Sequence, residues 1–494
     1  MPIDPTQPLP MADDCLPDSI AKPWREYRDA WAAHHANPGN ATVRKALGIE
    51  GADESVSPSS GDAAARSMRL PASEWLLYTS KHFSLVTDVP EARAAAIIIN
   101  LERFYAVWTQ LFFPLWKDRR AGNLPPTNVR HRVVIISDAN QFRELVRGEL
   151  AGTKAEGIYS DLKRTSYFLD SDDDAASMWH EITHQLLNEA TTDRSRTRAG
   201  ERQDFWMVEG IACYMESMTI VGDHATVGGW QSSRLQYARH QLLGTGTDMP
   251  LATMRRDGRI AVQRRDDLVR WYTVAAANVH QMADHENGAG WLGVLKQLAT
   301  IYQGNRSELA RCNHPPSVSL ASYLDIDDSQ LQAVAPGSMA SLCLTRTRVT
   351  SDGLAKIAPQ SKLRWLDVSF LTIETDDVTQ LCPLPDHLEQ LSLEATGIDA
   401  GIAPWIATAK RLREVDLSST RIDDSVIASI DADAPMETLW LTGATITDAS
   451  IDTIAAMRTL KYVDVQRTGV SAAGVARLCK QRPDLVVNPL EIAP

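Results

Sequence analysis

Residues 418–427, SSTRIDDSVI, and residues 442–451, TGATITDASI, are two copies of the pattern that decides the fold of the C-terminal third. The pattern's short apolar–x–apolar runs begin at Leu342, Leu366, Leu391, Val415, Leu439 and Val463, with spacings of 24, 25, 24, 24 and 24 residues. Seven residues after each start stands another aliphatic residue: Val349, Ile373, Ile398, Ile422, Ile446 and Val470. A fixed period of this length predicts a solenoid, whose units bury their apolar sides only against neighbouring units.

A third apolar position strengthens the repeat. Three residues before the last five starts stand Leu363, Leu388, Leu412, Met436 and Leu460. The pattern resembles leucine-rich repeats over about residues 336–490, with threonine in most units where the family has asparagine. The resemblance implies an α/β solenoid over residues 336–494 that binds a protein partner on its concave side.

The composition limits the classes of protein to consider. A chain of 494 residues is expected to form two or three domains. Its net charge of −13 argues against nonspecific binding to nucleic acid or to an anionic membrane. The most apolar stretch, residues 92–101, contains Arg93 and is followed by two charged residues, so no membrane span is expected.

The N-terminus and the cysteines indicate the compartment. The first residues lack the basic start and apolar run of a signal peptide, so we expect a cytoplasmic protein, unless the start is wrongly assigned. The 6 cysteines are scattered without a CxxC pair. We therefore expect reduced thiols rather than a disulfide framework or a thiolate zinc site.

The rest of the chain divides by pattern into three further regions. Residues 1–70 contain one helix, at 23–35 with Pro23 in its first turn, and a flexible linker at 55–67. Residues 71–310 form an α+β domain with strand signals before residue 171 and a mainly helical half after it. Residues 311–335 are a proline-containing linker, to which Cys312 and His314 belong.

The sequence HEITH at residues 180–184 is the strongest chemical signal. On a helix His180 and His184 share one face, about 40° apart, and Glu181 lies about 100° from His180. Zinc binds neutral imidazoles held on a rigid surface, and a carboxylate beside the metal can take a proton from a metal-bound water. Asp172, Asp173 and Asp174 stand at the expected helix start, where carboxylates complement the helix dipole. An ordinary helix with solvated histidines is the alternative, which a third ligand would exclude.

Glu209, in WMVEGIACYMES at residues 206–217, is the expected third ligand. It completes a His2Glu set for one Zn²⁺ per chain and leaves a fourth position for water. Gly210 beside it indicates close approach of another backbone. Cys213, one turn on, is expected to be a small packing residue.

Three residues near these ligands could support a ligand histidine. Glu216 lies seven residues after Glu209 on the same face and could hydrogen-bond such a histidine, or it could simply be solvated. Asn188 and Glu189, one turn after His184, are weaker candidates for the same role.

HEITH followed by W-x-x-E-G resembles the gluzincin metallopeptidases, and the runs KHFSLVTD and GIYSDLKRTSYFL narrow the resemblance to peptidase-MA-like domains. It covers about residues 74–300. The resemblance implies a zincin-like fold, with His180, His184 and Glu209 as zinc ligands and Glu181 as general base. It also directs attention to Tyr272, whose hydroxyl would stabilise the oxyanion, although a core or surface tyrosine fits the sequence equally well.

One departure from the family and one candidate strand shape the expected activity. The chain has no G-x-M-E-N-like stretch to bind a free amine, which favours an endopeptidase over an exopeptidase. RTSYFLD at 164–170 could be the edge strand that pairs with a peptide substrate, or a plain structural strand.

The expected function is therefore zinc-dependent hydrolysis of peptide bonds, in which Glu181 activates zinc-bound water and returns the proton to the leaving amine. A non-catalytic zinc-bearing scaffold, whose repeats mediate protein–protein interaction, is the alternative. A structural site would have no use for Glu181, which favours catalysis. Hydrolysis of a non-peptide bond by the same residues also fits the motif.

Overall fold

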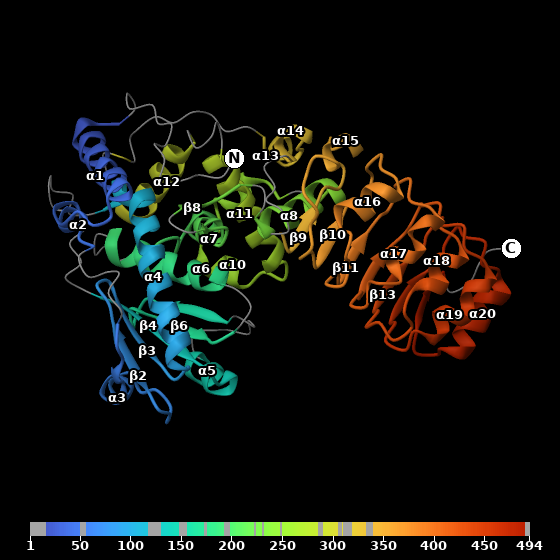
Figure 1. Ribbon diagram of the computed structural model, residues 1–494, viewed down its shortest axis with the longest axis horizontal. Coiled ribbons are helices and arrows are strands. Elements are labelled where there is room, and N and C mark those ends of the chain that lie inside the picture. Colours follow the sequence, from blue (N-terminus) through green and yellow to red (C-terminus); the bar gives the residue numbers. More distant parts are fainter. Residues whose placement is uncertain are drawn as a thin grey trace. The chain divides into compact units, whose positions relative to one another are not determined.

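The structure is a computed structural model (Figure 1) and it describes most of the chain. The described residues are 16–49, 56–116, 130–147, 156–171, 175–191, 198–221, 224–229, 232–247, 249–284, 290–304, 309, 319–331 and 339–489. The chain forms two compact units of mixed α/β structure. Unit 1 comprises Met1–Ser232 and Met249–Val318, and unit 2 comprises Ser233–Asp248 and Ser319–Pro494.

Unit 1 is built on a six-stranded sheet with the order β1-β2-β3-β4-β6-β5. Its strands are β1 (Ser59–Ser60), β2 (Leu76–Thr79), β3 (Phe83–Thr87), β4 (His131–Ile136), β5 (Gly157–Ser160) and β6 (Thr165–Leu169). The central strands β3, β4 and β6 are parallel, and the outer pairings are antiparallel. Most residues of these central strands are buried, polar ones included, as is typical of parallel strands in the middle of a sheet.

Helices fill the rest of unit 1. They are α1 (Asp18–Ala36), α2 (Ala41–Leu47), α3 (Asp62–Met68), α4 (Glu91–Phe112) with the 3-10 turn η2 (Phe113–Leu115), α5 (Ala139–Val146), α6 (Ala175–Leu186), α7 (Phe205–Met215), α9 (Leu251–Met254), α10 (Arg259–Gln263), α11 (Leu268–Asp284) and α12 (Trp291–Gln303). A π-helical segment, η3 (Leu187–Thr191), extends α6, and a hairpin of β7 (Thr219–Val221) and β8 (His224–Thr226) follows α7. One apolar core lies between the sheet and α3 and α5, and it includes Val86, Val134 and Phe142.

The N-terminal region differs from the prediction in two places. The first helix begins at Asp18, and Pro23 lies inside it rather than in its first turn, because buried Ile20 and Ala21 extend the apolar face N-terminally. The predicted flexible linker at 55–67 is wrong for its described residues, since Ser59–Ser60 form β1 and Asp62 begins α3. A two-residue edge strand gave no apolar signal because both of its side chains are exposed.

Unit 2 contains seven parallel strands in chain order. They are β9 (Ser341–Cys343), β10 (Trp365–Asp367), β11 (Gln390–Ser392), β12 (Glu414–Asp416), β13 (Thr438–Trp440), β14 (Tyr462–Asp464) and β15 (Val486–Asn488). The six predicted start positions stand opposite one another in register, from Leu342 to Val463. Val487 of β15 continues this row as a seventh member that the pattern did not include.

Short helices form the second layer of unit 2 (Figure 1). They are α13 (Leu320–Leu324), α14 (Asp328–Leu331), α15 (Ser351–Leu354), α16 (Thr375–Leu381), η7 (Ala400–Ile402), α17 (Ala403–Ile406), α18 (Asp424–Ser429), η8 (Asp448–Ser450), α19 (Ile451–Ala456) and α20 (Ala472–Gln481). The aspartates of the repeat join successive helices, since Asp424 accepts hydrogen bonds from the backbone and hydroxyl of Thr447, which caps η8. Asp448 binds Ser471, the cap of α20, in the same way.

Threonine holds the turn that follows the strands. The hydroxyls of Thr347, Thr396, Thr420 and Thr468 each donate to the carbonyl three residues earlier, at 2.6 to 2.7 Å. Four residues after the centre of each of the first six strands the backbone is left-handed, at Arg346, Phe370, Ala395, Ser419, Gly443 and Arg467. The departure from asparagine therefore keeps a turn that repeats in register with the strands.

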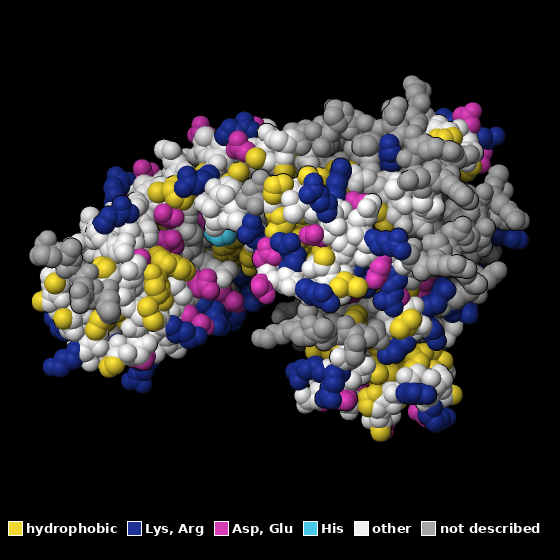
Figure 2. All heavy atoms as spheres, turned by 180° about the vertical axis from the view of Figure 1, so that it is seen from behind, with side chains coloured by type: hydrophobic (Ala, Val, Ile, Leu, Met, Phe, Trp, Pro, Cys, Tyr) yellow, Lys and Arg dark blue, Asp and Glu magenta, His cyan; other side chains and the backbone are white. Residues whose placement is uncertain are grey.

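Charges of alternating sign stand immediately before five strands of unit 2, at Arg364, Glu389, Arg413, Glu437 and Lys461. Arg364 pairs with Glu389 at 2.9 Å. Glu437 pairs with both of its neighbours, Arg413 and Lys461. Elsewhere on the described surface that Figure 2 shows, basic side chains are scattered among acidic and uncharged ones.

Two predicted boundaries differ from the division into units. Residues 320–331 of the predicted linker form α13 and α14 in unit 2, whereas Cys312 and His314 lie outside the described residues. Residues 233–248, predicted as part of the 71–310 domain, also belong to unit 2. Their described part forms α8 (Ser233–Arg239) and the π-helical segment η4 (His240–Gly244).

Residues 233–248 belong to unit 2 because they bind the edge strand of its sheet. Strand β9 is an end strand, and its Cys343 N–H donates to Gln236 Oε1 at 2.8 Å. The carbonyl of Cys343 accepts from the Arg239 guanidinium at 2.7 Å. Helix α8 thus satisfies backbone groups that an end strand would otherwise leave unpaired.

We expect Arg239→Met to lower the free energy of unfolding of unit 2 by about 2 to 4 kcal/mol. The fully buried guanidinium also donates to Leu324 O at 2.8 Å, so its loss leaves two backbone carbonyls without this donor. Urea unfolding of the full chain measures the effect. Arg421→Met is the matched control, because Arg421 is 64% exposed and pairs only at the surface, and it should change stability by less than about 1 kcal/mol. Equal urea midpoints for the two variants would contradict the prediction.

Candidate metal centre

Helix α6 carries His180 and His184 on one face and packs its opposite face against the core. Trp179, Ile182 and Leu186 are buried on its other side, and Trp179 stacks on Phe104 with ring centroids 4.8 Å apart. The side chains of His180 and His184 are 12% and 13% exposed. The helix begins at Ala175, and Asp172–Asp174 lie outside the described residues. Apolar packing therefore fixes the helix and leaves both imidazoles slightly exposed.

Helix α7 brings Glu209 to the two histidines. The helix is buried throughout, and at Gly210 a Cβ atom would stand 2.7 Å from the carbonyl oxygen of Ala275. Glycine is thus required for the close contact of α7 with α11, which agrees with the prediction of a packing reason. Glu209 Oε2 lies 3.4 Å from His180 Nε2 and 3.4 Å from His184 Nε2, and the two nitrogens are 3.2 Å apart.

These three distances suit a tetrahedral zinc ion. Ligands about 2.0 to 2.1 Å from zinc in tetrahedral geometry are separated by about 3.3 to 3.4 Å. The donors, two imidazole nitrogens and one carboxylate oxygen, are of the types that zinc binds in three-ligand catalytic sites. The residues present therefore fit the expected metal in both chemistry and spacing.

Electrostatics shows that the cluster favours positive charge. Burial alone would raise the pKa of Glu209, but His184 and His180 hold it well below its ordinary range. Burial alone would lower the pKa of His180, but its contacts with Cys213, Glu209 and Glu216 raise it well above its ordinary value. A cation at this position would replace the proton that otherwise neutralises the buried carboxylates.

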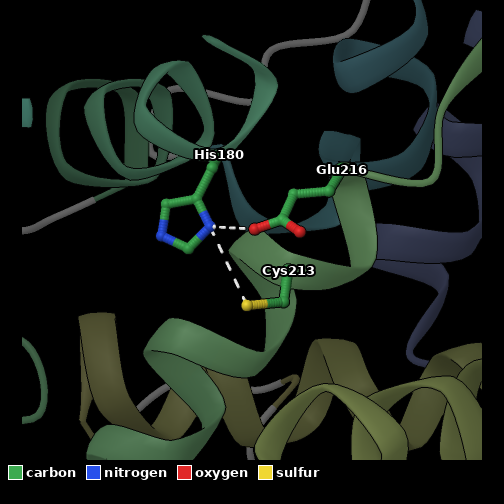
Figure 3. A group of neighbouring side chains, drawn as sticks. All are labelled: His180, Cys213 and Glu216. Atoms are coloured by element: carbon green, nitrogen blue, oxygen red, sulfur yellow. Dashed lines mark hydrogen bonds and ion pairs between the residues drawn. The ribbon is translucent and has the colours of Figure 1, made fainter. Parts of the chain in front are cut away.

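The structure places Glu216 on the far nitrogen of a predicted ligand (Figure 3). Glu216 Oε1 lies 2.8 Å from His180 Nδ1, and the thiol of Cys213 lies 3.8 Å from the same nitrogen. Since Nδ1 carries one proton at most, its bond to Glu216 fixes the tautomer that leaves Nε2 free for a metal. Cys213 is fully buried, as expected for a packing residue, and it also contacts the histidine.

We expect Glu216→Ala to weaken zinc binding about 10- to 100-fold, because His180 loses the acceptor that orients its ring. Competition with a zinc chelator gives the affinity. Glu216→Gln is the matched control, since its amide oxygen can still accept the Nδ1 proton, and its affinity should stay closer to wild type. If alanine and glutamine variants bind zinc as tightly as wild type, Glu216 does not support the ligand.

Glu181 stands beside the cluster and is held by the backbone. Its Oε1 lies 3.9 Å from His180 Nε2, and its Oε2 accepts a hydrogen bond of 2.8 Å from the N–H of Tyr159 in β5. The sheet order places β5 at the free edge, with β6 between β4 and β5. The prediction that 164–170 could be the edge strand is therefore wrong, and that segment is a structural strand. Sequence could not distinguish the two strands because both are short and their order depends on tertiary pairing.

Tyr272 lies near the start of α11 and is brought to the same cluster. Burial raises the pKa of its phenol far above the ordinary value, and the nearby negative charges of Glu209 and Glu181 and a hydrogen bond with Glu209 raise it further. Its hydroxyl therefore stays protonated beside the predicted ligands and base.

Asn188 and Glu189 contact residues that the sequence did not indicate. The amide of Asn188 donates to the hydroxyl of Tyr159 at 3.0 Å. Glu189 lies 2.7 Å from His131 Nδ1 and accepts from the Tyr159 hydroxyl at 3.3 Å. That either residue hydrogen-bonds a ligand histidine stays a prediction, and the sequence gave no sign of His131 or Tyr159. Both are single polar residues in strand patterns, without a fixed spacing to HEITH.

Comparisons with known proteins add little to this geometry. No family model matches the chain, and no curated protein matches it. A leucine-rich-repeat protein of Leptospira interrogans is similar in structure, with 15% identity and a TM-score of 0.22 over 31% of this chain. The match spans about half, 49%, of that protein's chain, and at this TM-score it establishes no common fold. None of these findings bears on the resemblance to gluzincins. No helix in the described segments is long and apolar enough to cross a membrane.

Proposed function

We propose that the chain is a zinc-dependent endopeptidase of the gluzincin type, with a zincin-like unit 1 and a leucine-rich-repeat solenoid as unit 2. The observation that carries the proposal is the convergence of His180, His184 and Glu209 at 3.2 to 3.4 Å with the Glu181 carboxylate beside them. Ligands of a purely structural metal would not need such a base, so the presence of Glu181 beside the three ligands favours catalysis.

The three ligands would hold one Zn²⁺ per chain. When bound, the ion would act as a Lewis acid that polarises the peptide carbonyl and makes the attacking water more acidic. Glu216 would keep His180 in the tautomer that binds through Nε2. Both histidines are slightly exposed, and substrate would approach the cluster from that side.

The remaining residues would move the proton and stabilise charge. Glu181, held through Oε2 by the Tyr159 N–H, would take a proton from the attacking water and give it to the leaving amine. Tyr272 would donate its hydroxyl to the oxyanion that develops on the carbonyl. Neither step requires a residue outside the described cluster.

Unit 2 would bind the protein substrate or another protein partner. The period of 24 residues, the parallel register and the left-handed turn shared by successive units support a leucine-rich-repeat solenoid. Solenoids of this kind offer a long strand face for contacts with a second protein. This role follows from architecture and does not identify the partner.

Metal content and peptide cleavage test the proposal together. The purified full chain is analysed for zinc, then incubated with casein and a peptide library, before and after treatment with a zinc chelator and readdition of Zn²⁺. Bound zinc with cleavage that the chelator abolishes and zinc restores supports a peptidase. Zinc without cleavage would favour the alternative of a zinc-bearing interaction scaffold. Absence of metal binding by His180, His184 and Glu209 would refute the proposal.

A further inference from the structure

Unit 2 contains a second group of metal-binding side chains that the proposed peptidase does not use. His240, Cys343 and Asp367 bring a nitrogen, a sulfur and an oxygen atom within 4.8 Å of one another. Cys343 and Asp367 stand opposite each other in register at the ends of β9 and β10. His240 comes from η4, the π-helical segment that follows α8, and π-helical turns are frequent at functional sites. The group thus joins residues 233–248 to the first two strands.

Two of the three side chains in this group are almost fully buried. Cys343 is 0% and Asp367 1% exposed, whereas the equivalent residues of the next two strands, Ser392 and Asp416, are only partly buried. A buried carboxylate costs several kcal/mol unless a cation or hydrogen-bond donors compensate it. Asp367 Oδ1 accepts from the N–H of Ser369 at 3.1 Å. Its Oδ2 faces both His240 Nδ1, at 2.8 Å, and Cys343 Sγ, at 3.6 Å.

We propose that His240, Cys343 and Asp367 form a second zinc site. For a tetrahedral ion with Zn–S of about 2.3 Å and Zn–O of about 2.0 Å, the sulfur and oxygen are about 3.5 Å apart, close to the 3.6 Å observed between Cys343 and Asp367. The nitrogen and oxygen would need to separate from 2.8 Å to about 3.3 Å. His240 can make this adjustment because its side chain is 42% exposed. Water would complete the coordination from the same exposed side.

The donor set selects the class of metal. A thiolate and an imidazole favour zinc and neighbouring transition metals, whereas Mg²⁺ and Ca²⁺ require oxygen ligands. Binding replaces the thiol proton of Cys343, which passes to solvent, and converts His240 to the tautomer protonated on Nε2. The charges of one thiolate, one carboxylate and the divalent ion then sum to zero inside the buried group. The site would fasten residues 233–248 to the edge of the sheet, independently of the peptidase centre.

Cobalt titration of the metal-free full chain tests this site, because cobalt replaces zinc and a bound thiolate gives a charge-transfer absorption in the near ultraviolet. We expect two Co²⁺ per wild-type chain and a thiolate band. His184→Ala should lose one Co²⁺ and keep the band, whereas Cys343→Ser should lose one Co²⁺ and the band. His240→Gln, at a partly exposed position that should tolerate the change, should also lose one Co²⁺. Cys213→Ser is the matched control, because Cys213 is also buried but lies beside the first metal centre. This variant should keep the band.

Two results would overturn the proposal. A band that survives Cys343→Ser but disappears in Cys213→Ser would assign the thiolate to the first centre. A wild-type chain that binds a single Co²⁺, lost completely in His184→Ala and unaffected by His240→Gln, would leave His240 and Asp367 as a plain ion pair. A wild type that binds one Co²⁺ with the band, unaffected by His184→Ala, would instead support the second site while removing the proposed peptidase centre.

Discussion

Glu181→Gln should lower kcat for peptide cleavage about 10²- to 10⁴-fold while the zinc content stays at the wild-type level. The amide cannot take a proton from water, yet its oxygen can still accept the hydrogen bond from the N–H of Tyr159. The side chain keeps its shape and its backbone contact, so the ligands His180 and His184 should be undisturbed. The loss therefore reports proton transfer rather than metal binding.

Steady-state kinetics on a peptide cleaved by the wild type, with zinc measured on the same samples, decides this prediction. Glu144→Gln is the matched control, since Glu144 is exposed and pairs only with Arg147 at the surface, and it should leave kcat unchanged. A Glu181→Gln variant that retains more than a tenth of wild-type kcat would show that another group serves as the base. Loss of zinc in the variant would show that Glu181 supports the metal instead.

Tyr272→Phe should lower kcat about 10²- to 10³-fold with little change in KM, the range seen when a single oxyanion donor is removed. The substitution removes only the hydroxyl, which stands near Glu209 and Glu181. Because the charge on the carbonyl oxygen develops only in the transition state, the loss should fall on kcat. Zinc affinity should remain close to that of wild type.

Kinetics of the Tyr272→Phe variant should be compared with those of Tyr78→Phe. Tyr78 is also buried in unit 1, but its hydroxyl donates to the carbonyl of Glu91, so its loss should affect stability alone. Equal kcat values for the two variants would assign Tyr272 to packing, the alternative that the sequence left open. A rise in KM without a fall in kcat would instead point to ground-state binding of the substrate.

The strands of unit 2 could be predicted because each sequence repeat carries the same local pattern. Leu342, Leu391 and Val463 sit at one phase of the period, and that phase is also the register of the sheet. The seventh strand, β15, was not predicted because no aliphatic residue stands seven positions after Val487, as one does in each of the other repeats. The place of residues 233–248 in unit 2 could not be predicted. It depends on the hydrogen bonds that Gln236 and Arg239 make to an edge strand, and no local sequence pattern reveals them.

The candidate metal ligands could be predicted because helical geometry turns sequence spacing directly into spatial spacing. His180 and His184 had to share a face, and the chemistry of zinc required a third donor such as Glu209. The hydrogen bond from Tyr159 to Glu181 depends instead on which strand lies at the sheet edge, which tertiary pairing decides. His131 and its partner Glu189 likewise meet only in the folded chain.

The alternating charges before the strands of unit 2 limit how the number of units can change. Loss of the single repeat that carries Arg413 would bring Glu389 beside Glu437, and like charges on neighbouring strands repel. Loss of two consecutive repeats, those of Arg413 and Glu437, would bring Glu389 beside Lys461, and these opposite charges would still attract each other. Each surface contact contributes less than about 1 kcal/mol, but the preference acts on every such deletion or duplication. Repeats of unit 2 should therefore be gained and lost in pairs, because an even number keeps opposite charges on neighbouring strands.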